Sequence, residues 1–189
     1  TLWHTLSLHD ALPISSGLKN TDRIQEMVKA GLDEIRFHPE PKYWSNMQNG
    51  PLHKIINETC KLTVKIAIEI PVLPEKKDNI IALIKWASEK GIDYINLNEL
   101  EFSEQNEIRL YKKGYKIKNE LSAAVKGSQE TAYEILDYFE DYPEPIGIHY
   151  CSSSFKDGIQ LTNRIKRRAN NIATIRDIIS DEGTLLKGI

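Results

Sequence analysis

The sequence predicts an α/β protein built on a parallel sheet, and three observations support this fold class. Short apolar runs rich in β-branched residues alternate with segments whose apolar residues recur at helical spacing. The centres of the first three runs, Ile35, Ile66 and Ile95, lie about thirty residues apart, which is the length of one βα unit. Two joints between helix and strand also match each other, GLDEIRFH over 31–38 and GIDYINLN over 91–98. Regular alternation of this kind is typical of a parallel sheet covered by helices.

Helix and strand signals alternate from residue 20 onward. The predicted helices span residues 20–31, 52–60, 78–91, 129–142 and 157–173. The predicted strands span residues 34–38, 63–72, 93–99 and 146–151, and an extra segment over 102–127 follows the third strand. Asn20 or Thr21 can cap the first helix and Asp78 the third, because short polar side chains accept hydrogen bonds from the free N–H groups of a first turn. Gly31 and Gly91 end these two helices, since glycine readily adopts the left-handed conformation of a C-terminal cap.

The units predict a partial parallel (β/α) barrel, TIM-barrel-like and truncated at its N-terminal side. A closed barrel of eight units needs about 250 residues, whereas this chain has 189. Residues 1–16 show no helix or strand period, and TLSLHDALPIS over 5–15 resembles the translation of a sequencing-library adapter. We therefore expect a non-native segment over 1–16, the partial barrel over 17–175, and the start of a C-terminal extension over 176–189.

Polar side chains are expected on one face of the sheet, near the C-terminal ends of its strands. Successive side chains of a strand point to opposite faces, so the apolar residues of each strand leave a second, polar set. That set comprises Arg36, His38, Glu69, Asn96, Asn98, His149 and Cys151. Parallel α/β folds bind ligands at this end. Unpaired polar groups buried there would cost about 1–3 kcal/mol each, so they either pair with one another or bind a ligand. For Glu69 the alternative to a ligand role is a salt bridge to Arg36 or Lys65.

Two other features suggest different functions. The loop Ser152–Ser154 with Lys156 could hold an anion at the N-terminus of the next helix, or its serines could simply cap that helix. The first reading supports a phosphate-binding (β/α)-barrel lyase or aldolase. A non-enzymatic RNA-binding protein is a second alternative, and its candidate contact residues are Arg164, Lys166, Arg167 and Arg168.

Composition narrows the classes of partner. The 25 basic and 27 acidic residues give a net charge of −2, which argues against nucleic acid as a partner and leaves no polybasic membrane anchor. No run approaches the roughly 18 apolar residues of a transmembrane helix. Cys60 and Cys151 are the two cysteines of the sequence and could form at most one disulfide. We therefore expect a cytoplasmic protein without a membrane partner.

Four segments occur in a characteristic order along the chain: GLDEIRFHP over 31–39, IEIPVLP over 68–74, GIDYINLNELEFS over 91–103 and HYCSSSFKD over 149–157. Together they resemble radical S-adenosylmethionine (SAM) enzymes, in particular an archaeal branch related to pyruvate formate-lyase activating enzymes. The resemblance covers most of the chain from about residue 18. It implies a partial (β/α)6 barrel that holds S-adenosylmethionine and a 4Fe–4S cluster, with reductive cleavage of the former giving a 5′-deoxyadenosyl radical.

The resemblance also implies roles for most of the polar set. Those implied to bind the cofactor are Arg36, His38, Glu69, Asn96 and Asn98. The resemblance fixes no role for His149 or Cys151, and we treat these two as candidate substrate-side groups. The family's Cys-x3-Cys-x2-Cys loop is absent from this sequence, so we expect no metal ligands here, cluster ligands in an upstream segment, and no activity from this chain alone. The expected partners are an electron donor and a substrate that is either a small molecule or a protein.

Overall fold

The computed structural model describes residues 11–14, 21–119, 122–143 and 146–187. The chain divides into two compact units. The first comprises residues 1–100 and 127–150, and the second comprises residues 101–126 and 151–189. Each unit is described by itself below.

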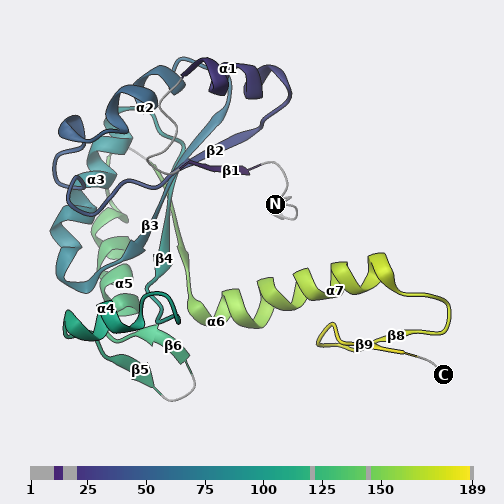
Figure 1. The fold of residues 1–189 in the computed structure, drawn as a ribbon. Coiled ribbons are helices and arrows are strands. Elements are labelled where there is room, and N and C mark those ends of the chain that lie inside the picture. Colours follow the sequence, from purple (N-terminus) through teal and green to yellow (C-terminus); the bar gives the residue numbers. More distant parts are fainter. Residues whose placement is uncertain (1–10, 15–20, 120–121, 144–145, 188–189) are drawn as a thin grey trace. The chain divides into compact units, whose positions relative to one another are not determined.

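A parallel sheet organises the first unit (Figure 1). In spatial order its strands are β1 (Ala11–Ile14), β2 (Glu34–Phe37), β3 (Lys65–Val72), β4 (Tyr94–Glu99) and β7 (Gly147–Cys151). The strands β1 to β4 run parallel to their neighbours. Ile35 pairs in register with Ile66, and Ile68 pairs with Ile95. The mixed α/β class and the parallel order of the predicted strands are thus confirmed for β2, β3 and β4.

Four helices complete this unit, and Figure 1 shows α2, α3 and α5 together on one side of the strands. They are α1 (Thr21–Lys29), α2 (His53–Thr59), α3 (Lys77–Glu89) and α5 (Ser128–Phe139), with short 3-10 turns at Met47–Asn49 and Pro74–Lys76. Several strand residues predicted to meet helices are fully buried, among them Ile35, Phe37, Ile68, Ile95 and Leu97, whereas Ile148 and Tyr150 of the last strand are only partly buried. Full burial of each such side chain stabilises the fold by about 1.5–3 kcal/mol. This apolar layer therefore holds the helices on one face of the sheet, and the side chains between these residues point to the opposite face.

The two matching joints of the sequence have matching structures. Gly31 and Gly91 have φ of 100° and 70°, the left-handed conformation that favours glycine. Each donates its N–H to a carbonyl three residues earlier, Val28 O and Ser88 O respectively. The predicted cap Asp78 is wrong, because the 3-10 turn before α3 runs directly into the helix and starts it at Lys77. Asp78 instead lies in the first turn, where its charge still favours the helix dipole.

One strand was not predicted. Ala11–Ile14 forms β1 at the edge of the sheet, paired with β2, although no element is expected within residues 1–16. An edge strand tolerates Pro13, because its missing N–H is not needed by a second neighbour. The rest of the adapter-like segment, including His4 and His9, lies outside the described residues.

The second unit contains short elements. They are α4 (Glu107–Lys112), β5 (Ile117–Asn119), β6 (Ser122–Val125), α6 (Ser153–Phe155), a π-helical stretch (Lys156–Leu161), α7 (Thr162–Ile172), β8 (Ile178–Ile179) and β9 (Leu185–Leu186). The strands β5 and β6 form one antiparallel pair, and β8 and β9 form another. The helical segment begins at Ser153, before the predicted start at residue 157, because Ser152 caps it. Within the described ranges, no helix has both the length and the apolar character needed to cross a membrane.

Candidate functional site

Most of the predicted polar side chains lie side by side and form one chain of hydrogen bonds, which we call the polar row. Its members, in order, are Glu34, Arg36, Glu69, Asn98, Asn96 and His149. Arg36 Nε donates to Glu34 Oε1 at 2.6 Å, and Arg36 Nη1 donates to Glu69 Oε2 at 3.2 Å. Asn98 Nδ2 donates to the other Glu69 oxygen at 2.7 Å.

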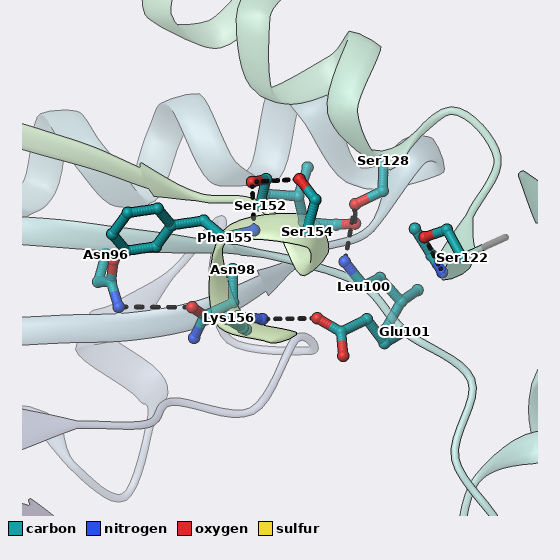
Figure 2. A network of polar contacts seen from close by, with 12 residues as sticks. Asn96, Asn98, Leu100, Glu101, Ser122, Ser128, Ser152, Ser154, Phe155 and Lys156 are labelled. Atoms are coloured by element: carbon teal, nitrogen blue, oxygen red, sulfur yellow. Dashed lines mark hydrogen bonds and ion pairs between the residues drawn. The ribbon is translucent and has the colours of Figure 1, made fainter. Parts of the chain in front are cut away.

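The row continues across the next strands. Asn96 Nδ2 lies 3.5 Å from Asn98 Oδ1, a contact that Figure 2 marks with a dashed line. The ring nitrogen Nδ1 of His149 lies 2.8 Å from Asn96 Oδ1. Four adjacent strands, β2, β3, β4 and β7, therefore contribute to one connected set of polar groups.

Strand alternation and register explain why these residues meet. Asn96 pairs in register with Glu69, so the two side chains stand next to each other on the same face. Arg36 pairs with Ala67, two residues before Glu69, and its long side chain reaches the Glu69 carboxylate. On the opposite face of β7, the Tyr150 ring meets Tyr133 of α5 with a centroid separation of 5.6 Å.

The ion cluster at one end of the row is largely removed from water. Arg36 has 17% of its side chain exposed, against 9% for Glu34 and 22% for Glu69. Burial alone would raise the pKa of Glu69, but the hydrogen bond from Asn98 and the charge of Arg36 outweigh it and hold that pKa below its ordinary value. Burial alone would lower the pKa of Arg36, but the hydrogen bond to Glu34 outweighs this effect, and the pKa of Arg36 is raised above its ordinary value. Two carboxylates and one guanidinium leave this end with a net negative charge.

His149 terminates the other end of the row and is the most exposed member. Its burial within the sheet face, together with the positive charge of Arg36, lowers the pKa of the imidazole. The ring is therefore neutral at pH 7, with Nδ1 engaged by Asn96.

Two of the predicted site residues are not linked into this row. Nε2 of His38 is buried and has no hydrogen-bond partner among the described residues. His38 instead lines a small open pocket with Pro39, Glu40, Tyr43, Met47, Gly50, Pro51 and Leu52. Cys151 is a buried cysteine outside any disulfide, and it ends β7 and is counted in the second unit.

The sequence reasoning missed three polar residues of this region. Glu34 is 6% exposed and could have been found, because it lies two residues before Arg36 and so shares its strand face. Tyr94 stands on the same face of β4 as Asn96. The pKa of its hydroxyl is raised, mainly because the group is partly buried and also because it lies near the Glu34 carboxylate. Ser128 joins two strand ends, accepting from Leu100 N and donating to Val72 O at 2.9 Å each (Figure 2). These bonds span 28 and 56 residues, so no local sequence signal indicates them.

The loop after β7 has a structural arrangement. Ser152 Oγ accepts from Phe155 N at 3.2 Å and so caps α6 (Figure 2). Lys156 Nζ forms an ion pair with Glu101 Oε1 at 2.9 Å. The capping interpretation of these serines is thus confirmed, and the Lys156 charge is balanced by a carboxylate of its own unit.

The described residues offer no metal centre. Nowhere in the described ranges do three His, Cys, Asp or Glu side chains gather as metal ligands would. Neither Cys60 nor Cys151 takes part in a disulfide, and burial raises the pKa of Cys60.

A curated protein is similar to this chain over most of the chain's length. A protein of Methanocaldococcus jannaschii, provisionally named a glycyl-radical enzyme activating enzyme, is 34% identical over 173 residues, which cover 90% of this chain and 45% of that relative. The chain thus spans about half the length of the curated relative that it matches. No protein-family model matches the chain, and no solved structure matches it either.

Enzymes that activate glycyl-radical enzymes are of the radical SAM type, and the relative comes from an archaeon. The similarity therefore confirms the resemblance predicted from the four sequence segments: over nine tenths of its length, this chain is related to radical SAM activating enzymes.

Proposed function

We propose that this chain forms part of the (β/α) barrel of a radical SAM activating enzyme, and that its polar row lines the S-adenosylmethionine site. The observation that carries the proposal is the row itself, which crosses β2, β3, β4 and β7 on a single sheet face. Parallel α/β folds bind ligands at the C-terminal ends of such strands. In this proposal Arg36, Glu69, Asn96 and Asn98 contact the cofactor, and His38 and His149 lie beside it.

The charge and chemistry of the row suit S-adenosylmethionine. Two carboxylates, Glu34 and Glu69, face one guanidinium, so the row carries a net negative charge with His149 neutral. The ligand carries a sulfonium and an ammonium against one carboxylate, which gives it a net positive charge. Opposite charges attract strongly where water is partly excluded. The asparagine amides and the Glu69 oxygens keep spare hydrogen-bonding positions for the ligand's hydroxyl and amino groups.

A 4Fe–4S cluster does not fit on the described residues. Such clusters are held by three or four thiolates, whereas this sequence has two cysteines, far apart along the chain. We propose that the cluster ligands belong to the part of the relative's length that this chain does not match. Together with such a cluster, bound S-adenosylmethionine would supply the radical that abstracts hydrogen from a substrate.

The partners follow from the same proposal. The name of the relative indicates a glycyl-radical enzyme as the protein that it activates. We propose a protein substrate of that type for the complete protein, together with an electron donor for the cluster. The alternative lyase or aldolase is less well supported, because Lys156 already pairs with Glu101 and Ser152 caps α6.

Calorimetric titration of the folded chain with S-adenosylmethionine tests this proposal. We expect saturable binding that weakens about tenfold in Glu69→Gln, since the loss of one charged contact costs about 1.4 kcal/mol or more. The matched control is Glu134→Gln, which makes the same chemical change at an exposed carboxylate on α5 that pairs with Lys77. This control should bind as the wild type does. Equal loss in both variants, or no heat of binding from a chain with native circular dichroism, would refute a cofactor role for the row.

A further inference from the structure

The hydrogen bonds of the polar row have a fixed direction, because one end of the row is an ion pair. Arginine can only donate hydrogen bonds, and an ionised carboxylate can only accept them. Glu69 accepts from Arg36 through Oε2 and from Asn98 through Oε1. The Asn98 amide must therefore turn its Nδ2 toward Glu69, which leaves its Oδ1 facing Asn96.

This direction passes from residue to residue along the row. Asn98 Oδ1 can only accept, so Asn96 presents its Nδ2 to it. Asn96 Oδ1 is then the atom that faces His149 Nδ1, at 2.8 Å. An amide oxygen carries no hydrogen, so the hydrogen of this bond must reside on Nδ1. A neutral imidazole carries a single N–H, and Nε2 of His149 consequently keeps a lone pair.

We propose that the Arg36–Glu69 ion pair sets the tautomer of His149 through Asn98 and Asn96, making the exposed His149 Nε2 an acceptor for a ligand hydroxyl or amine. Arg36 and Glu69 act on His149 as positioning residues, because neither one touches its ring. A carboxylate or any other unprotonated oxyanion is excluded as the partner of Nε2, since two lone pairs would face each other. The tautomer follows from the row alone, and only the identity of the ligand rests on the proposed function.

The tautomer is unusual enough to be diagnostic. In free neutral histidine the hydrogen resides mostly on Nε2, the opposite of the arrangement inferred here. Reversing the row would place Asn98 Oδ1 against a Glu69 oxygen and lose a charge-assisted hydrogen bond. A loss of that kind favours the Nδ1–H form by about tenfold or more. If the row had no fixed direction, His149 would show the same ratio of Nδ1–H to Nε2–H tautomers as free histidine.

Two-bond proton–nitrogen correlation spectra of the full chain, labelled with ¹⁵N-histidine at pH 8, read the tautomer directly. The His149 signals are assigned as those lost in His149→Ala. We expect a protonated, pyrrole-like Nδ1 and an unprotonated, pyridine-like Nε2. A His149 ring with its hydrogen on Nε2 would overturn the proposal.

Matched carboxyl-to-amide variants test the path. In Glu69→Gln the new amide must turn its oxygen toward Arg36, which can only donate, and its Nε2 toward Asn98. The direction of the row then reverses, and the hydrogen of His149 should move to Nε2. Glu34→Gln makes the same change on the far side of Arg36, off the path to His149, and should leave the tautomer unchanged. Adding Asn96→Asp to Glu69→Gln should restore Nδ1–H, because a carboxylate at this position can only accept.

If Glu69→Gln does not fold, Asn98→Ala interrupts the same chain of hydrogen bonds while sparing the ion pair, and it should move the His149 tautomer toward the ratio of free histidine. If whichever of Glu69→Gln and Asn98→Ala folds leaves the His149 tautomer unchanged, the proposal is wrong.

A final titration identifies the ligand class and separates this proposal from the cofactor assignment. S-adenosylmethionine should move the Nε2 signal away from its pyridine-like position as the nitrogen accepts a hydrogen bond, whereas acetate and sulfate, which carry no hydrogen to donate, should not. If S-adenosylmethionine fails to bind while the tautomer and its variants behave as described, the cofactor assignment fails and the tautomer inference stands. If sulfate shifts Nε2 and S-adenosylmethionine does not, the ligand class proposed here is wrong.

Discussion

Replacing Arg36 by methionine tests whether the polar row depends on its central cation. The variant keeps an unbranched, flexible side chain, though a shorter one, and removes the guanidinium that pairs with Glu34 and Glu69. Breaking a buried pair by removing one member costs about 3–5 kcal/mol. Because the side chains of Arg36 and Glu69 are 17% and 22% exposed, some screening remains, and we expect a loss of about 2–4 kcal/mol in the free energy of unfolding at pH 7. Urea titrations followed by far-ultraviolet circular dichroism measure this difference.

The pH dependence of this loss distinguishes charge from packing. The pKa of Glu69 is lowered in the folded protein, so its contribution is present above the unfolded value of about 4.3 and is lost as pH falls through the folded one. In Arg36→Met the uncompensated carboxylates become easier to protonate, and the deficit relative to wild type should shrink as pH falls from 7 toward 4. Lys77→Met removes an exposed ion pair with Glu134 and should change the free energy of unfolding far less than Arg36→Met does, at any pH. A loss in Arg36→Met no larger than in this control, or one independent of pH, would refute the electrostatic reasoning.

Three further predictions concern single positions. A Cβ at Gly147 would lie 2.9 Å from Tyr94 Cβ on the neighbouring strand. Gly147→Ala should therefore lower the free energy of unfolding by about 1–3 kcal/mol. Gly158→Ala is the control and should not lower it, because nothing lies within 4 Å of a Cβ at that position. Ser128→Ala leaves two strand-end backbone groups without their partner and should cost about 1–3 kcal/mol; unchanged amide exchange at the end of β4 would contradict this role. The His149 pKa is lowered, so its ring should titrate below the usual value of about 6.5 in a series of NMR spectra. A midpoint at or above that value would show that burial and Arg36 do not act on it as described.

The sheet and its polar face were accessible from the sequence because both follow from a period of two. Once Ile35 and Phe37 are placed toward the helices, Arg36 must point the other way, and the same reasoning places Glu69 and Asn96. The structure links these residues as alternation requires. The cofactor roles assigned to them remain predictions, as do the boundaries at residues 16 and 175.

Other features depend on contacts that no local pattern encodes. Ser128 bonds to Val72 and Leu100, which are remote in sequence and meet it only after the helix has packed on the sheet. The strand β1 contains a proline, so its composition does not predict a strand. It is extended because it pairs with β2. The isolation of His38 from the row also could not be foreseen, because the chain leaves β2 at Phe37 and His38 turns into the pocket that follows.

The central claim is that S-adenosylmethionine binds along the polar row, and side-chain amide NMR tests it most directly. Titration with S-adenosylmethionine should shift the Nδ2 amide signals of Asn96 and Asn98. The signals of Asn57 on α2 and Asn106 beside α4, which are amides of the same type outside the row, should stay in place. Shifts at Asn57 or Asn106 with none at Asn96 and Asn98 would place the ligand elsewhere and contradict the account.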